Sequence, residues 1–154
     1  MKKSVEETLL LRENKRGKII PWSIRKCDYH EIGNYVNSLE VKEAHGKYVP
    51  DSTFFCLDIE RNIFVGAVNI RHYLNDALIV GDGHIGDGIR PSERGKGFGM
   101  QMVALTLLEC DKLGIKNVLM CFNKDNIASV KTIIKNGGIL QYWIACCKTV
   151  IYML

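Results

Sequence analysis

The sequence lacks the features that mark several common classes of protein. Its 154 residues contain no run of about 20 apolar residues, so no membrane-spanning helix is predicted. The only apolar stretch near the start, residues 9–11, is too short for the core of an export signal. The net charge is only +4 and no basic run interleaved with aromatic residues occurs, so nucleic acid is not an expected partner. We therefore predict a cytoplasmic protein that binds neither a membrane nor nucleic acid.

Cysteine and histidine patterns that indicate metal or disulfide sites are also missing. The six cysteines include no Cys-x-x-Cys pair, and the four histidines are scattered without the spacing of helical metal ligands. Several cysteines stand within apolar runs, where cysteine acts as a small hydrophobic residue. We therefore predict reduced thiols and no bound metal.

What the chain does contain is enough apolar sequence for one core. With 47% hydrophobic and 25% charged residues, residues 1–154 are predicted to form a single domain. Residues 1–20 are polar and charged, and they are expected to form either a helix or a loosely held arm. The oligomeric state stays open, and a homodimer is one candidate.

The order of the predicted elements indicates a mixed α/β fold. A hairpin of strands precedes a strand–helix–strand unit, whose crossover should be right-handed. Between them, residues 77–80 form a short apolar run flanked by turn signals. Hydrophobic spacing predicts helices at 29–43, at 97–113 and from Asp125 or Asn126 to 136, and strands at 53–59, 63–72, 84–90, 117–122, 139–145 and 149–153. The predicted inner faces are Met100, Val103, Ala104, Leu107, Leu108 and Leu113 in the second helix and Ile127, Val130, Ile133 and Ile134 in the third.

The most informative motif lies between the strand at 84–90 and the helix at 97–113. We call it the glycine loop, and its residues are Arg94, Gly95, Lys96, Gly97, Phe98 and Gly99. A glycine-rich turn that opens a helix exposes main-chain N–H groups without intrahelical partners, and the helix dipole adds partial positive charge. Glycine lets the backbone approach a ligand closely, and the two basic side chains add charge. The loop therefore predicts a site for a diphosphate or a similar anion.

Two other phosphate-binding motifs fit less well. A P-loop requires G-x-x-x-x-G-K-[ST], but Lys96 is followed by Gly97 and the first glycine position holds Arg90. Residues 81–86 match G-x-G-x-x-G literally, but an extended run follows them where a dinucleotide fingerprint needs a helix. A hairpin turn at residues 81–83 is the preferred interpretation.

The glycine loop, in the form R-x-x-G-x-G after Ile89-Arg90-Pro91, resembles the acetyl-CoA loop of the GNAT family of N-acetyltransferases. Asn126-Ile127-Ala128-Ser129 resembles the N-x-x-A/S element of that family, and residues 49–140 look like a bacterial subgroup of predicted acetyltransferases. The resemblance implies a GNAT-like mixed, mainly antiparallel sheet flanked by helices, with abbreviated N- and C-terminal elements. It also implies acetyl-CoA as cosubstrate, held by the glycine loop, Ile89, Asn126 and Ser129, near a bulge that splays two strands apart.

The sequence departs from the family where an acid would protonate the leaving thiolate, because Ile133 stands where many relatives have tyrosine. For the base that deprotonates an amine, His84 and Asp87 are the predicted catalytic residues, with His72 and Glu93 as further candidates. His84 could equally be a hydrogen-bonded residue of the sheet. In a strand, His84 and Asp87 point to opposite faces.

Two functions follow from these features. The first is an acetyl-CoA-dependent N-acetyltransferase that moves the acetyl group directly to a primary amine of a small molecule or peptide. The second is a catalytically weak or inactive CoA-binding or regulatory module. Ile133 and the short C-terminal segment favour the second mildly.

Overall fold

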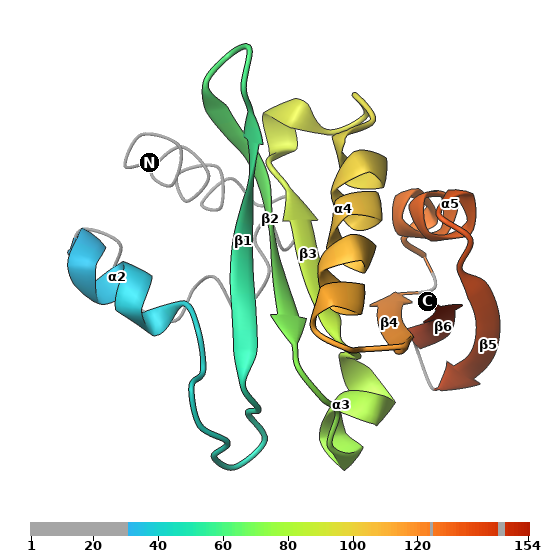
Figure 1. The fold of residues 1–154 in the computed structure, drawn as a ribbon. Coiled ribbons are helices and arrows are strands. Elements are labelled where there is room, and N and C mark those ends of the chain that lie inside the picture. The colour runs from blue at the N-terminus through green and yellow to red at the C-terminus, as the bar shows by residue number, and fades with distance from the viewer. Residues whose placement is uncertain (1–30, 124, 145–146) are drawn as a thin grey trace.

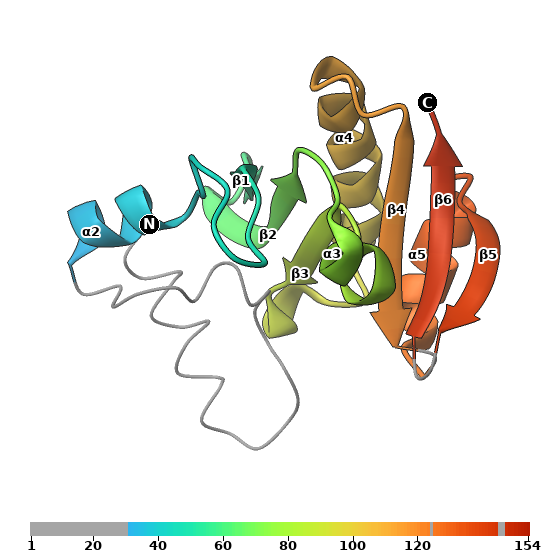
Figure 2. The same ribbon diagram turned by 90° about the horizontal axis from the view of Figure 1, so that it is seen from below.

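The computed structural model describes residues 31–123, 125–144 and 147–154. Its first sheet is antiparallel, in the order β1 (Asp51–Asp58), β2 (Ile63–Arg71) and β3 (Ile85–Ile89). The second is also antiparallel, in the order β4 (Asn117–Asn123), β6 (Cys147–Met153) and β5 (Ile139–Ile144). The two sheets meet between β3 and β4 (Figures 1 and 2). A mixed α/β fold with mainly antiparallel strands is thus confirmed.

Two helices share one side of these sheets and close the main core. The helix α4 (Phe98–Lys112) connects β3 to β4, and α5 (Ile127–Lys135) packs beside it (Figure 1). One cluster of buried side chains joins both sheets to both helices, so the sheets are not independent units. Its members are Val68, Ile70, Ile85, Val103, Leu107, Cys110, Ile115, Val118, Met120, Phe122, Ile133, Val150 and Tyr152.

The opposite face of the first sheet has a smaller apolar cluster. Ala67 belongs to it while its neighbour Val68 belongs to the main core, because successive side chains of a strand point to opposite faces. Tyr35 and Leu39, from α2 (Ile32–Ser38) and its end, pack with Ala67, and Phe55 lies against them. The first predicted helix is therefore present but shorter than residues 29–43, of which 29 and 30 lie outside the described residues.

The buried faces of α4 and α5 differ from the predicted ones. In α4 the buried residues are Met102, Val103, Thr106, Leu107 and Cys110. The predicted Leu108 is 60% exposed, and Ile127 and Ile134 of α5 are exposed as well. Apolar residues occur on more than one side of both helices, so spacing alone does not single out the face that packs.

Residues 77–80, which the sequence showed as a short apolar run between turn signals, belong to a helix. The helix α3 (Asp76–Gly81) begins after Asn75, whose side chain accepts a hydrogen bond from the N–H of Leu78. Gly83 ends it, with φ +66° and its N–H donated to the carbonyl of Leu78 at 2.7 Å. What the sequence presented as two turn signals is thus a helix cap at one end and a helix stop at the other. No hairpin turn lies at residues 81–83.

Candidate functional site

The glycine loop has a conformation that depends on its glycines. Gly95 and Gly97 have φ values of +77° and +88°, in the left-handed region that other residues avoid. Gly97 is the N-cap of α4 and makes no side-chain cap. A Cβ built at either glycine would meet nothing within 4 Å, so this part of the loop borders open space. The loop thus presents bare backbone to solvent.

The main-chain N–H groups of residues 95–99 have no acceptor within the described part of the chain. The first backbone donations at the start of α4 come from Met100 and Gln101, both to the carbonyl of Gly97. Five consecutive donors at the positive end of a 15-residue helix are therefore available to a ligand. The chemistry of this donor set fits an anion with several oxygens.

The two basic residues of the loop differ in their surroundings. Arg94 is exposed and donates its Nε to the carbonyl of Ile89 at 3.1 Å, which ties the loop back to the end of β3. Lys96 donates its Nζ to Glu93 Oε2 at 3.1 Å, so a carboxylate already compensates its charge. Glu93, one of the candidate bases, therefore serves as a partner of cations. The Lys96 bond lowers its pKa further after the larger effect of Arg61.

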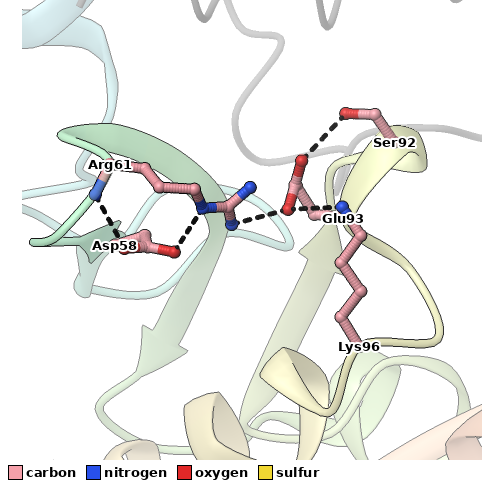
Figure 3. A network of polar contacts seen from close by, with 5 residues as sticks. All are labelled: Asp58, Arg61, Ser92, Glu93 and Lys96. Atoms are coloured by element: carbon pink, nitrogen blue, oxygen red, sulfur yellow. Dashed lines mark hydrogen bonds and ion pairs between the residues drawn. The ribbon is translucent and has the colours of Figure 1, made fainter.

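Arg61 is the residue that sequence reasoning missed. It lies in the turn between β1 and β2, and its Nη2 donates to Glu93 Oε2 at 2.7 Å (Figure 3). The signal in the sequence was weak, because Asp58 and Arg61 look like an ordinary hairpin turn. Only the fold brings residue 61 next to residue 93.

The strands β3 and β4 splay apart beside the glycine loop. The described contacts between their main chains are a bridge between Gly83 and Met120 and the donation of His84 N–H to the carbonyl of Leu119 at 2.7 Å. Beyond this junction, β3 is hydrogen-bonded to β2 alone. The two strands therefore separate here as predicted, but the register of β3 with β2 shows no bulge at this point.

The open edge of β3 carries main-chain groups of Asp87 and Ile89. Arg71 donates its N–H to His84 O, and Arg90 donates its N–H to Val65 O. Because hydrogen-bonded pairs alternate along an antiparallel ladder, Gly86 and Gly88 also face β2. The N–H and C=O groups of Asp87 and Ile89 then point toward the splay, where an extended ligand could pair with them.

His84 connects the two sheets at their junction. Its side chain is 8% exposed, and Nδ1 lies 3.0 Å from the N–H of Leu119. A main-chain N–H can only donate, so Nδ1 carries no proton and the ring is neutral in this arrangement. Burial, and next the charge of Arg71, lower the pKa of His84. Its role as proton acceptor stays a prediction, while its structural role is visible.

Acid should weaken this junction. A lowered pKa means that the stabilisation by neutral His84 is complete above the unfolded pKa of about 6.5 and is lost as the pH falls below it. Between pH 8 and pH 5, the free energy of unfolding should fall more in the wild type than in His84→Gln, whose amide oxygen can still accept from Leu119. Urea titrations at each pH measure this difference. Parallel pH profiles of the two proteins would show that His84 does not protonate at the junction.

Asp87 combines solvent access with a perturbed carboxyl group. Its side chain is exposed, yet the protein around it desolvates the carboxylate and raises its pKa. Water can reach the carboxyl group, while protein atoms fill much of the space around it. The charge of Asp87 also raises the pKa of Tyr152, after the larger effect of burial, so the two lie near each other. The Tyr152 hydroxyl donates to the carbonyl of Ile133 at 3.3 Å.

The second family-like element, Asn126 to Ser129, forms the start of α5, the helix that packs beside α4. Asn126 is the N-cap of α5, and its Oδ1 accepts from the N–H of Ser129 at 3.2 Å. Thr132 and Asn136, near the other end of α5, are the residues that approach the glycine loop. Asn136 donates to the carbonyl of Met100 at 3.2 Å, and a Cβ at Gly99 would lie 3.9 Å from Thr132 Oγ1.

Other candidate residues lie elsewhere. His72 follows β2 at the end remote from the β1–β2 turn, with its Nε2 2.9 Å from Ser52 Oγ. Within residues 31–123, 125–144 and 147–154, no three His, Cys, Asp or Glu side chains converge on a point that could hold a metal ion. No helix of this part of the chain has the length and apolar character needed to cross a membrane.

Comparison with known proteins by sequence yields nothing: no family model matches the chain, and no curated protein matches it. Comparison by structure, in contrast, finds similar proteins. The chain is similar to spermidine N-acetyltransferase SpeG from Vibrio cholerae, with a TM-score of 0.63 and 15% identity over 97% of this chain and 89% of that one. It is similar to N-acetyltransferase PseH from Campylobacter jejuni, solved in complex with acetyl coenzyme A, with a TM-score of 0.56 and 14% identity over 84% of each chain.

A third similar structure is the GNAT domain of PAT from S. lividans, with a TM-score of 0.56 and 10% identity over 72% of this chain. The match spans 65% of that chain, slightly less than two thirds of its length. At these identities the likeness concerns the fold. The fold is that of the GNAT acetyltransferases, as the glycine loop and the order of the strands predicted.

Proposed function

We propose that the protein is an N-acetyltransferase that moves an acetyl group from acetyl-CoA to a primary amine. The observation that carries this proposal is the row of uncapped N–H groups at residues 95–99, beside a splayed pair of strands in a GNAT fold. These amides would bind the diphosphate of CoA, and exposed Arg94 would add charge. The chemistry of this donor set fits the oxygens of a diphosphate.

The pantetheine arm would run along the open edge of β3. The edge main-chain groups of Ile89 and Asp87 would pair with its amides, as the sequence predicts for Ile89. From Ile89 to His84 a strand extends about 17 Å, so an extended arm can reach the neighbourhood of Asp87. A strand N–H near the thioester carbonyl would stabilise the negative charge that develops on its oxygen. Asn126 and Ser129 would border the arm from the start of α5.

Asp87 is the residue we assign to the amine. A carboxylate there attracts a protonated amine. Because the pKa of Asp87 is raised, its carboxylate is a stronger base and can accept the proton of the amine. The amine attacks the thioester carbon, the C–S bond breaks and the CoA thiolate leaves. Holding both substrates in one complex supplies much of the acceleration. His84 then keeps the splay in shape, which makes it a positioning residue.

Asp87→Asn separates stability from catalysis. Because the pKa of Asp87 is raised in the folded state, this residue contributes stability below its unfolded pKa of about 3.9. The contribution is lost as the pH rises through the pKa of the folded state. The variant should therefore unfold at a higher temperature than the wild type at pH 7, with no gain near pH 4. Its kcat should fall at least about 100-fold if Asp87 is the base. Asp76→Asn, at an exposed helix residue, is the control. An unchanged kcat in Asp87→Asn would remove Asp87 from the mechanism.

The proposal itself is tested by thiol release. Acetyl-CoA is mixed with a panel of amines, polyamines, amino acids and peptides, and free CoA is followed while calorimetry measures CoA binding. Turnover with one class of amine supports the enzyme and identifies the acceptor. Tight binding of CoA without turnover on the panel would instead favour a CoA-binding module. The observation that favours this second function is Ile133, which stands where many members of the resembled family have a tyrosine.

A further inference from the structure

The glycine loop is held from outside by a segment that precedes it by more than 30 residues in the sequence. Glu93, in the short helix η2 (Pro91–Glu93), stands immediately before the loop, and its residue is only 5% exposed. Three side chains contact its carboxylate. Glu93 Oε2 accepts from Arg61 at 2.7 Å and from Lys96 at 3.1 Å, and Ser92 Oγ lies 3.5 Å from Oε1 (Figure 3).

Arg61 is itself held in place by Asp58, within the β1–β2 turn. Its Nε donates to Asp58 Oδ2 at 2.7 Å, and its main-chain N–H donates to Asp58 Oδ1 at 3.1 Å. These two bonds hold the guanidinium on the β1–β2 turn, which Figure 3 shows facing η2. The paired carboxylates raise the pKa of Arg61, and Arg61 in turn is the largest cause that lowers the pKa of Glu93.

Arg61 contacts both ends of the glycine loop. Immediately before the loop it binds Glu93, and near the other end of the loop its guanidinium lies over the ring of Phe98, 5.5 Å from the centroid. Phe98 is the first residue of α4. One side chain therefore fixes the distance between the point where the loop begins and the point where it ends.

Apart from Arg61, the loop is held by the side-chain bonds of Arg94 to Ile89 O and of Lys96 to Glu93, and by few backbone bonds. Between these points, its described backbone bonds are the donation of Arg94 N–H to Pro91 O at a long 3.4 Å and those that Gly97 O accepts. Two glycines in the left-handed region add conformational freedom in the absence of a constraint. A loop of this kind binds an anion more weakly unless it is held in the binding conformation beforehand, because ordering it then opposes binding.

The charges of this network also bear on an anion. Asp58 and Glu93 balance Arg61 and Lys96, so the four side chains bring no net negative charge to the loop. Without Arg61, two carboxylates would face one lysine beside the diphosphate site. The loss of order in the glycine loop and the added repulsion would then both weaken the binding of an anion.

We infer that Arg61 is a positioning residue for CoA, which holds the glycine loop in its anion-binding conformation through Glu93 and Phe98. The inference rests on the proposed function for its ligand, while the clamp itself is a property of the free protein. Arg61 touches neither the acetyl group nor the amine. Its removal should therefore lower affinity for the cofactor without changing the chemical step.

The first test needs no ligand. Trypsin cleaves after Arg94 and Lys96, and both sites lie in the exposed loop. In Arg61→Ala and Glu93→Gln, cleavage at these two sites, followed by mass spectrometry, should be at least about fivefold faster than in the wild type. Lys112→Ala, which breaks an ion pair with Glu109 at the far end of α4, should leave it unchanged. Equal cleavage rates in Arg61→Ala and the wild type would overturn the clamp.

The second test concerns the cofactor. Arg61→Ala should raise the KM for acetyl-CoA and the Kd for CoA at least about tenfold while kcat at saturation stays within about twofold. Combining it with Glu93→Gln should give less than the sum of the two single effects, since both variants lose the contact between Arg61 and Glu93. A loss of kcat with unchanged KM, or unchanged affinity despite a loosened loop, would overturn the positioning role. If the wild type does not bind CoA, the proposed function fails, and the trypsin result alone decides whether the clamp exists.

Discussion

Replacing Gly97 by glutamate is expected to abolish measurable binding of acetyl-CoA. The new carboxylate would stand at the N-cap of α4, among the uncapped amides, where it would compete with the diphosphate for the same donors and repel it. Losing two such charge-assisted hydrogen bonds costs about 3 kcal/mol or more, which corresponds to a loss of affinity of at least about 100-fold. Calorimetry with CoA measures it.

Two control variants separate charge from backbone strain at this position. Gly97 has φ +88°, so any side chain there strains the backbone by about 1–2 kcal/mol even though a Cβ meets nothing within 4 Å. Gly97→Ala has the strain without the charge, and Gly97→Asn has a residue that tolerates this region better. Both should keep most of the affinity. If Gly97→Ala loses as much affinity as Gly97→Glu, loop conformation and not the amide donors explains the effect.

Gly83→Ala is expected to produce the largest loss of stability. A Cβ at Gly83 would lie 2.4 Å from the main-chain oxygen of Leu119, on a backbone with φ +66°. The neighbouring atom is backbone, so relief requires the two sheets to move apart at their junction. We expect the free energy of unfolding to fall by about 4 kcal/mol, at the high end for single substitutions.

Gly114→Ala is the matched control for that loss. Gly114 has φ +77° at the end of α4, and a Cβ there would meet nothing within 4 Å. Its cost should therefore be the strain of about 1–2 kcal/mol alone. Urea unfolding of the two variants gives the difference that belongs to the β3–β4 junction. If both variants lose the same stability, the close approach of Gly83 to Leu119 is not what holds the sheets together.

The sequence was sufficient for the fold class and for the position of the loop. Apolar spacing, glycine positions and motif order are local signals, and each predicted strand from residue 53 to residue 122 overlaps an observed one. Helix faces were less predictable, because α4 and α5 have apolar residues on several sides and the packing partner decides which side is buried. The segment at 77–80 was misinterpreted since Asn75 and Gly83 serve as cap and stop of a helix too short to show a period.

Contacts between distant residues were the part that no local signal could supply. The sequence suggested Glu93 as a candidate base and Lys96 as a basic residue of the loop, and only the fold shows that Arg61 reaches Glu93. His84 had two open interpretations, and its bond to Leu119 depends on a strand 35 residues away. In the same way, Asp87 of β3 and Tyr152 of β6 lie near each other although they are far apart in the sequence. The C-terminal segment, which seemed short for a final hairpin, pairs as β5 and β6 in the second sheet.

The most direct test of the central claim observes the amides themselves. In a ¹⁵N-labelled protein, the N–H signals of residues 95–99 are followed by NMR during titrations with CoA, with ADP and with pantetheine. The diphosphate-containing ligands should shift these five signals strongly, and pantetheine should leave them nearly in place. If CoA binds while these signals do not move, the diphosphate lies elsewhere and the assignment of the glycine loop is wrong.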